Sequence, residues 1–279
     1  MVTQPQRLFL SLSAKRIKLT VAYDGTDFCG WASQVDQRTV HGTLKETVRQ
    51  ISGEDYEIIG ASRTDSGAHA KGQVCHFDTT NPMPIEKWKR AFNDRLPLDV
   101  SIVESKAVSP DFHSRFSADR RWYRYRIQVG DRDPHRARFT FNWYKALDVE
   151  LMNRSAQTLV GEHDFYAFSQ DLVGVENTVR TLYSVDVKAV KDEIWVDVVG
   201  TAFVRGMMRR ISGSLWEIGR GQRPSSDLVR LLTEPEAEGL HWPTVLPAKG
   251  LTLMKVFYGR HPRDNRLNKI CIEKEDDNE

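Results

Sequence analysis

A polar, glycine-punctuated stretch between two apolar runs limits the folds open to this chain of 279 residues. Residues 60–77 read GASRTDSGAHAKGQVCHF, and they follow the strand-like run YEII at 56–59. The stretch itself ends in QVCHF at 73–77, which is again strand-like. Small polar residues and glycines between two apolar runs are typical of a connection between strands. We therefore expect two strands that flank a loop with one carboxylate, Asp65.

Asp65 has two possible roles in this loop. An aspartate side chain often hydrogen-bonds to nearby backbone and thereby stabilises a turn. The same carboxylate, with Arg63 two residues before it and Gly67 two residues after it, could instead be catalytic. The spacing alone favours the turn and leaves catalysis open.

The elements around this loop follow a known order. We expect strands at 17–23, 56–59, 73–77 and 100–103, and helices that start near Thr43 and Pro84, from their apolar periodicities. This order, β-α-β-β-α-β, is that of the split ferredoxin-like unit, with Asp65 between its second and third strands. Residues 15–110 are the expected N-terminal half, and 1–14 a flexible lead-in.

The second half of the chain repeats this order without repeating the sequence. The expected strands are 121–129, 181–190, 194–199 and 251–258, and the expected helices are 148–160, 203–218 and 227–232. Residues 111–262 are thus the expected C-terminal half, and the acidic residues of 263–279 predict a solvated charged tail. The fold class is α+β, with two ferredoxin-like halves around a mainly antiparallel mixed sheet and helices on one side.

The strand at 121–129, RWYRYRIQV, alternates basic and aromatic side chains. Arginine pairs with phosphate and stacks on bases, and tyrosine offers a flat face with a polar tip. We therefore interpret Arg121 and Arg124 as RNA-binding residues. The alternative is a strand whose outer face carries solvated arginines.

Composition excludes several other classes. A net charge of only +2 means that any nucleic-acid surface depends on how the charge is distributed. Three widely spaced cysteines fit neither a disulfide framework nor a zinc site, and they indicate a reducing cytoplasm. No apolar run reaches the length of a signal peptide core or of a membrane span. We expect a cytoplasmic protein with no metal site and no membrane contact.

Several motifs resemble those of the TruA family of tRNA pseudouridine synthases. GASRTDSGAHAKGQVCHFDT is similar to the catalytic motif of that family, although Ser62 stands where a glycine is common. YDGTDFCGW, FHSRFSA, GEHDF, TAFVRGMMRRISGSL and LPAKGLTL resemble other family segments, so the likeness extends from about Ile17 to Tyr258. In GEHDF, His163 and Asp164 fit a structural loop better than a catalytic pair, because no third partner is visible.

The resemblance implies roles for particular residues. Asp65 corresponds to the nucleophile, and Arg209 to the arginine that faces it. Tyr123 corresponds to the tyrosine that stacks on the target base, although Tyr125 lies on the same side of the strand and stays an alternative. Arg63 corresponds to the arginine that enters the RNA and holds the flipped nucleotide, with a salt bridge inside the loop as its alternative.

The resemblance also implies a reaction and its partners. It implies isomerisation of uridine to pseudouridine in the anticodon stem-loop of tRNA, at positions 38, 39 and 40, by a homodimer. No cofactor is needed, because the product is an isomer of the substrate. Two other hypotheses stay open, an RNA-binding protein without catalysis and an aspartate-nucleophile hydrolase of small substrates. The hydrolase predicts a second carboxylate near Asp65, and residues 60–77 contain none.

Overall fold

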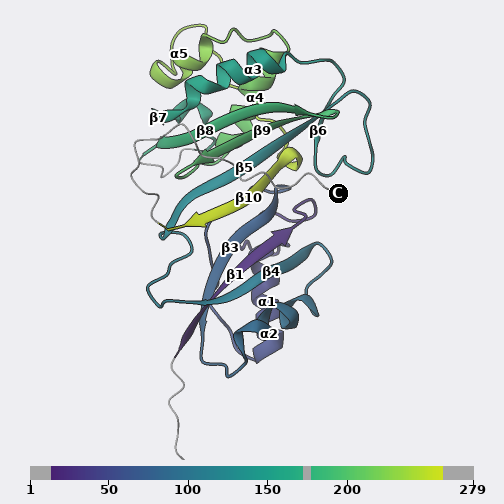
Figure 1. The fold of residues 1–279 in the computed structure, drawn as a ribbon, viewed down its shortest axis with the longest axis vertical. Helices are drawn as coiled ribbons and strands as arrows, with labels where there is room; N and C mark the ends of the chain where they lie inside the picture. The colour runs from purple at the N-terminus through teal and green to yellow at the C-terminus, as the bar shows by residue number, and fades with distance from the viewer. Residues whose placement is uncertain (1–13, 172–176, 260–279) are drawn as a thin grey trace, which may run out of the picture.

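One mixed sheet with helices packed on it forms the body of the protein (Figure 1). The computed structural model describes residues 14–171 and 177–259. The expected lead-in, apart from its last residue, and the expected charged tail lie outside these residues. No helix of the described part is long and apolar enough to cross a membrane.

The strands belong to a single sheet. They are β1 (Lys15–Tyr23), β2 (Ile59–Gly60), β3 (His69–Thr79), β4 (Val100–Val108), β5 (Ala118–Val129), β6 (Phe141–Trp143), β7 (Gly161–Asp164), β8 (Val179–Val190), β9 (Glu193–Gly200) and β10 (Leu251–Tyr258). Their order is β4-β1-β3-β10-β5-β9-β8-β7, with β2 also paired to β3 and β6 to β5.

Both halves have the strand order of a ferredoxin-like unit. In the first half β4, β1, β3 and β2 are successive neighbours, and in the second half β10, β5, β9 and β8 are. The halves meet where β10 runs parallel to β3, with Thr252 opposite His69. Strands β5 and β6 are also parallel, whereas the other pairs are antiparallel. The predicted fold class is confirmed.

Five α-helices are present in the described residues. They are α1 (Val40–Ser52), α2 (Ile85–Asn93), α3 (Val149–Ala156), α4 (Met207–Gly219) and α5 (Asp227–Thr233). The Thr39 side chain accepts a hydrogen bond from the Gly42 amide and starts α1, and Gly53, with a φ of 75°, ends it. The Asp148 side chain accepts from the Leu151 amide and starts α3 in the same way.

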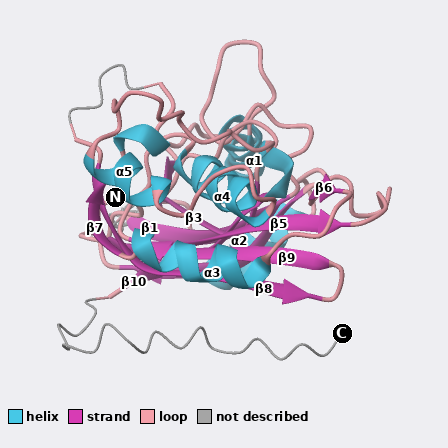
Figure 2. Cartoon of the chain, turned by 90° about the horizontal axis from the view of Figure 1, so that it is seen from above, coloured by secondary structure: helices cyan, strands magenta, loops and turns pink. Residues whose placement is uncertain are grey.

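The helices cover one face of the sheet. Residues of all five helices join one core cluster with the inward side chains of the strands, such as Ile17, Leu19 and Val21 of β1. Figure 2 shows α1, α4 and α5 together on one side of the strands. A second, small cluster of Trp122, Val199 and Met254 lies on the opposite face, because side chains alternate along a strand.

The structure differs from the sequence-based expectations at a few elements. Helix α4 starts at Met207 and not at 203, because Gly206 has a φ of 75° and breaks the helical backbone. In place of the strand expected at 56–59, the structure has the two-residue strand β2, Ile59–Gly60. Strands β6 and β7 were not expected, and both are short elements of three and four residues. The segment with His163 and Asp164 is β7, which pairs with β8.

Candidate active site

The Asp65 loop, residues 61–68, joins β2 to β3 and packs against the turn that follows β1. The Trp31 amide donates to the Thr64 carbonyl at 3.2 Å, and the Gly67 amide donates to the Phe28 carbonyl at 3.2 Å. At the foot of the loop, the Thr64 hydroxyl lies 2.8 Å from the Tyr23 hydroxyl, and both residues are buried. The loop backbone is therefore fixed on both sides of Asp65.

Gly30 allows this contact between the turn and the loop. Its φ is +81°, and a Cβ atom there would lie 2.6 Å from the Thr64 carbonyl oxygen. We expect Gly30→Ala to lower the free energy of unfolding by roughly 2 to 4 kcal/mol, because it combines a left-handed backbone with an overlap. Urea denaturation measures this loss.

Gly53→Ala is the matched control for Gly30→Ala. Gly53 has nearly the same φ, +75°, and no atom lies within 4 Å of the position that a Cβ would take there. The control therefore carries the backbone strain without the overlap. Equal losses from both variants would contradict a tight contact between Gly30 and the Asp65 loop.

Asp65 forms an ion pair with Arg209 of α4, 144 residues further along the chain. The Arg209 Nη1 donates to Asp65 Oδ2 at 3.1 Å, and the two side chains are 20% and 23% exposed. The carboxylate is thus partly screened from water and still open to a ligand. Since α4 belongs to the second half, the pair connects the two halves of the molecule.

Arg209 is oriented by the segment 243–250, which we call the strap. The Arg209 Nε donates to the Leu246 carbonyl at 2.6 Å, and the Leu246 amide donates to the Arg209 carbonyl at 3.4 Å. Upstream, the buried Glu217 side chain of α4 accepts from the Thr244 amide at 3.0 Å and from its hydroxyl. The strap is therefore attached to α4 through both Thr244 and Leu246.

The remainder of the strap contacts the other site elements. The Tyr125 hydroxyl donates to the Pro247 carbonyl at 2.7 Å, and Gly250 leaves room for the Tyr125 ring. His69 Nε2, at the start of β3, lies 3.1 Å from the Lys249 carbonyl. Burial lowers the pKa of His69, which favours the neutral ring that the bond from the Gly25 amide to Nδ1 requires, with Nε2–H donating to the Lys249 carbonyl.

Tyr123 and Tyr125 lie in different environments, although both point to the helical side of β5. Tyr125 is fully buried, and its hydroxyl is committed to the strap. Tyr123 packs edge-on against Phe203, with ring centroids 4.8 Å apart. Burial raises the pKa of Tyr123, the Ser62 hydroxyl and the Arg121 guanidinium lower it, and the charge of Asp65 raises it again. Of the two tyrosines, Tyr123 is the one whose pKa the charge of Asp65 raises, and it is also buried, at 6% exposed.

Arg63 is exposed at the tip of the loop. It forms no hydrogen bond and no ion pair with any residue that the structure describes, so the alternative of a salt bridge within the loop is not formed there. Its guanidinium is available to a ligand.

Arg121 is a buried arginine without a carboxylate partner in the described residues. It is 8% exposed, and its nitrogens donate to the carbonyls of Thr201, Arg115 and Ala61 at 2.5, 3.0 and 3.4 Å. Its Nε also lies 3.4 Å from the Ser62 hydroxyl. Burial lowers its pKa. Arg121 therefore holds the start of the Asp65 loop through its contacts with Ala61 and Ser62.

Arg124, which we interpreted from the sequence as an RNA-binding residue, is not brought to Asp65. It is one residue from Tyr123, so the strand pleat turns it to the other face of the sheet. There its Nε donates to Asp197 Oδ1 at 2.9 Å, and its guanidinium lies 3.7 Å from the centre of the Trp195 ring.

We expect Arg124→Met to affect stability and not RNA affinity. Asp197 is fully buried, so among the described residues the variant leaves its carboxylate with only the Trp122 indole N–H as side-chain donor. Breaking such a pair costs about 3 kcal/mol, and replacing both partners in Arg124→Met/Asp197→Leu recovers most of it. Urea denaturation gives the stability, and the KM for RNA is predicted to stay unchanged. A raised KM at full stability would return Arg124 to the binding surface.

Some supporting residues were not singled out from the sequence. Gln73, fully buried, accepts from the Ser62 amide at 3.2 Å and donates to the Ser62 carbonyl at 2.7 Å. Glu217 fastens the strap. Each is a polar residue inside an apolar run, in GQVCHF and SLWEIG respectively. That pattern is the signal that could have indicated a buried, hydrogen-bonded role.

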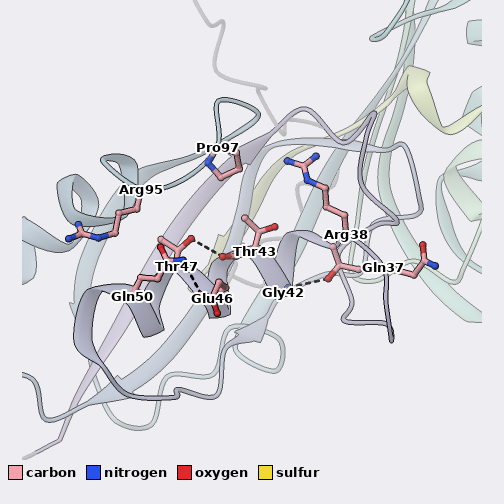
Figure 3. A pocket seen from close by; sticks show the side chains of 10 residues that line it. Gln37, Arg38, Gly42, Thr43, Glu46, Thr47, Gln50, Arg95 and Pro97 are labelled. Atoms are coloured by element: carbon pink, nitrogen blue, oxygen red, sulfur yellow. Dashed lines mark hydrogen bonds between the residues drawn. The ribbon is translucent and has the colours of Figure 1, made fainter.

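Other possible sites lie away from Asp65. No group of three or more His, Cys, Asp or Glu residues in the described chain could hold a metal ion. A shallow hollow of about 360 Å³ lies beside α1 (Figure 3). Its lining includes Arg38, Glu46 and Arg95, and none of the predicted site residues. Fold and geometry together define an α+β protein with a carboxylate–arginine site where its two halves meet.

Comparison with known proteins agrees with this class. The sequence profile described as tRNA pseudouridine synthase matches residues 19–117 and 155–259. A tRNA pseudouridine synthase A of Brevibacillus brevis is 40% identical over 245 residues, which are 88% of this chain and 100% of the relative. One of Lactobacillus delbrueckii is 38% identical over 258 residues, 91% of this chain and 98% of the relative. The chain belongs to the tRNA pseudouridine synthase family, and is therefore an isomerase.

Among solved structures, a Cbf5-Nop10-Gar1 complex is similar with a TM-score of 0.29 and 10% identity, over 70% of this chain and 53% of that chain. This likeness is too weak to support any argument on fold or function.

Proposed function

We propose that this protein isomerises uridine to pseudouridine in the anticodon stem-loop of tRNA, at positions 38, 39 and 40, with Asp65 as the nucleophile. The observation that carries the proposal is the 3.1 Å ion pair between Asp65 and Arg209, formed across the two halves. A nucleophilic carboxylate must be ionised and must reach its substrate, and a partly exposed carboxylate with an arginine partner meets both needs.

The reaction sets requirements that these residues can meet. The bond between uracil N1 and ribose C1′ breaks, the base turns, and a bond between C5 and C1′ forms. Asp65 forms a transient bond to the ribose or to the base, and this bond breaks again before the product leaves, which regenerates the carboxylate. The C5 hydrogen leaves as a proton and N1 gains one, so atoms balance without a cofactor. The detached base must be held away from water while it turns. The strap, which contacts the Asp65 partner Arg209, and the packed rings of Tyr123 and Phe203 are the apolar groups proposed to do this.

Three residues have proposed roles in binding the target nucleotide. Tyr123 stacks on the uracil ring, since its ring is already fixed by Phe203. Arg63 enters the RNA and holds the flipped nucleotide, because its exposed guanidinium has no described partner. Arg121 supports binding indirectly, as it holds Ala61 and Ser62 at the base of the loop.

Two further properties rest on the family resemblance. We infer that the protein is a homodimer and that both subunits line the tRNA cleft. The proposal that it acts in the cytoplasm rests on its three widely spaced cysteines. The domain bounds 15–110 and 111–262 remain a proposal, supported by the ferredoxin-like strand order in each half.

Tritium release tests the reaction and its position together. tRNA transcripts with 5-tritiated uridine are incubated with the protein, and the tritium released to water is counted. We expect release from a transcript with uridines at positions 38–40 and none when those uridines are replaced by cytidine. Release that persists after the replacement would contradict the proposed position, and no release from any tRNA would contradict the proposed reaction.

A further inference from the structure

An exposed aromatic ring stands outside the site described so far. Phe116, in the connection between β4 and β5, is 78% exposed. Figure 1 shows this connection passing between the two halves of the molecule. Most large apolar side chains of the described chain are buried. A single exposed apolar side chain is common on protein surfaces, so the role of Phe116 depends on what holds it and on the charges around it.

The ring is held in place by its neighbours. The His113 ring stacks on Phe116, with centroids 4.3 Å apart and an interplanar angle of 28°. His113 Nδ1 accepts from the amides of Arg115 and Phe116 at 3.2 and 3.1 Å. The His113 amide donates to the Ser117 hydroxyl at 2.9 Å, which closes the turn. One face of Phe116 is therefore supported and the ring is already ordered.

A buried serine anchors the same turn to the sheet. Ser114 is fully buried, and its hydroxyl donates to the Ile59 carbonyl of β2 at 2.6 Å. The Ser114 carbonyl accepts from the Tyr258 hydroxyl of β10 at 2.7 Å. The turn 113–117, which we call the His-Phe turn, is thus fixed to strands of both halves.

Arg121 connects the His-Phe turn to the Asp65 loop. A single nitrogen of its guanidinium, Nη2, donates to the carbonyls of Arg115 and of Ala61, at 3.0 and 3.4 Å. Ala61 is the first residue of the Asp65 loop. The turn and the loop therefore share one buried cation and are close together.

The charge around Phe116 fits a polyanion. Arg115 is exposed, lies over the Phe116 ring at 5.8 Å, and makes no ion pair with a described residue. Arg63 of the Asp65 loop is likewise without a described partner. Flat aromatic rings beside unpaired arginines are typical of surfaces that bind unpaired bases and their phosphates.

We propose that Phe116, supported by His113, is a stacking platform for an unpaired base of the RNA substrate other than the target uridine. This inference rests on the proposed function and adds a second contact to it. The base stacks on the open face of Phe116, and Arg115 contacts the adjoining phosphate. RNA loops offer such bases because they are not paired.

The test compares Phe116→Ala with Phe116→Trp and with Leu98→Ala, a matched control because Leu98 is another large apolar side chain on the surface. Filter binding measures the Kd for a tRNA transcript at several salt concentrations. We expect Phe116→Ala to weaken binding about 10-fold, with an unchanged slope of log Kd against log salt, because stacking releases no counterions. Phe116→Trp keeps a flat aromatic ring at this position, so we expect it to bind tRNA with the wild-type Kd. We expect the wild-type Kd for Leu98→Ala as well. Tritium release by Leu98→Ala is expected to stay at the wild-type rate at every tRNA concentration.

Three results would overturn the platform. They are an unchanged Kd in Phe116→Ala, an equal loss in Leu98→Ala, and a loss of the oligomer in sedimentation, which would assign Phe116 to a protein contact. Failure of the proposed function has a different signature, because wild-type protein would then bind tRNA without releasing tritium.

Discussion

Asp65→Asn is expected to abolish pseudouridine formation while leaving the protein folded and able to bind tRNA. The amide is nearly isosteric with the carboxylate but is not a nucleophile, so the covalent step is lost. We expect the rate to fall by roughly 10⁴-fold or more, the scale seen when a nucleophile is removed. Single-turnover tritium release measures the rate, and filter binding measures the affinity for tRNA.

Asp78→Asn serves as its control. Asp78 also belongs to the β3 region, where it pairs with Arg16 at 2.6 Å on the surface. The pair is bidentate, with Arg16 Nε also donating to Asp78 Oδ1 at 2.7 Å, but it lies at the end of β3 that is remote from the Asp65 loop. The control should therefore keep the wild-type rate. Retained activity in Asp65→Asn would remove Asp65 from the centre of the reaction.

Arg209→Ala has the second largest expected effect. It removes the cation next to Asp65 and leaves the Leu246 carbonyl without its Nε donor. Loss of one preorganised electrostatic partner costs about 10²- to 10³-fold in kcat. Arg209→Lys should recover only part of the rate, because an ammonium group does not reproduce the two-sided contact of the guanidinium. Single-turnover rates at saturating tRNA measure both variants.

Arg205→Ala is the control for a general loss of positive charge near α4. Arg205 precedes the helix and is paired with Asp171 on the surface, at 2.6 Å. Its removal changes the net charge as Arg209→Ala does, but it leaves Asp65 untouched. Equal losses of kcat in the two variants would mean that Arg209 acts through net charge and not through its contact with Asp65.

The order of elements could be predicted from the sequence because the apolar periods are long and regular. Strand β1, for example, buries Ile17, Leu19 and Val21 at every second position, as its alternation predicts. The short strands β6 and β7 escaped prediction, since three or four residues carry too little pattern. The predicted start of α4, at residue 203, was wrong because Gly206 breaks a segment whose composition is otherwise typical of a helix.

The candidate site could be predicted only in part. No periodicity places Asp65 against Arg209, which lies 144 residues away, and the pairing was implied by the family resemblance alone. The choice between Tyr123 and Tyr125 depends on the strap, since the Pro247 carbonyl binds the Tyr125 hydroxyl. The density of arginines on β5 suggested RNA contact for Arg124, but the strand pleat turns that residue to the other face.

Nucleoside analysis of tRNA treated with the protein tests the central claim most directly. The tRNA is digested after the reaction, and uridine, pseudouridine and free uracil are quantified by chromatography, with Asp65→Asn run in parallel. We predict that with the wild type the amount of pseudouridine formed equals the amount of uridine lost, and that no uracil is released. We predict that Asp65→Asn leaves the nucleoside composition of the tRNA unchanged. Free uracil without pseudouridine would contradict the account, because it would identify a hydrolase, and equal conversion by both proteins would contradict the role of Asp65.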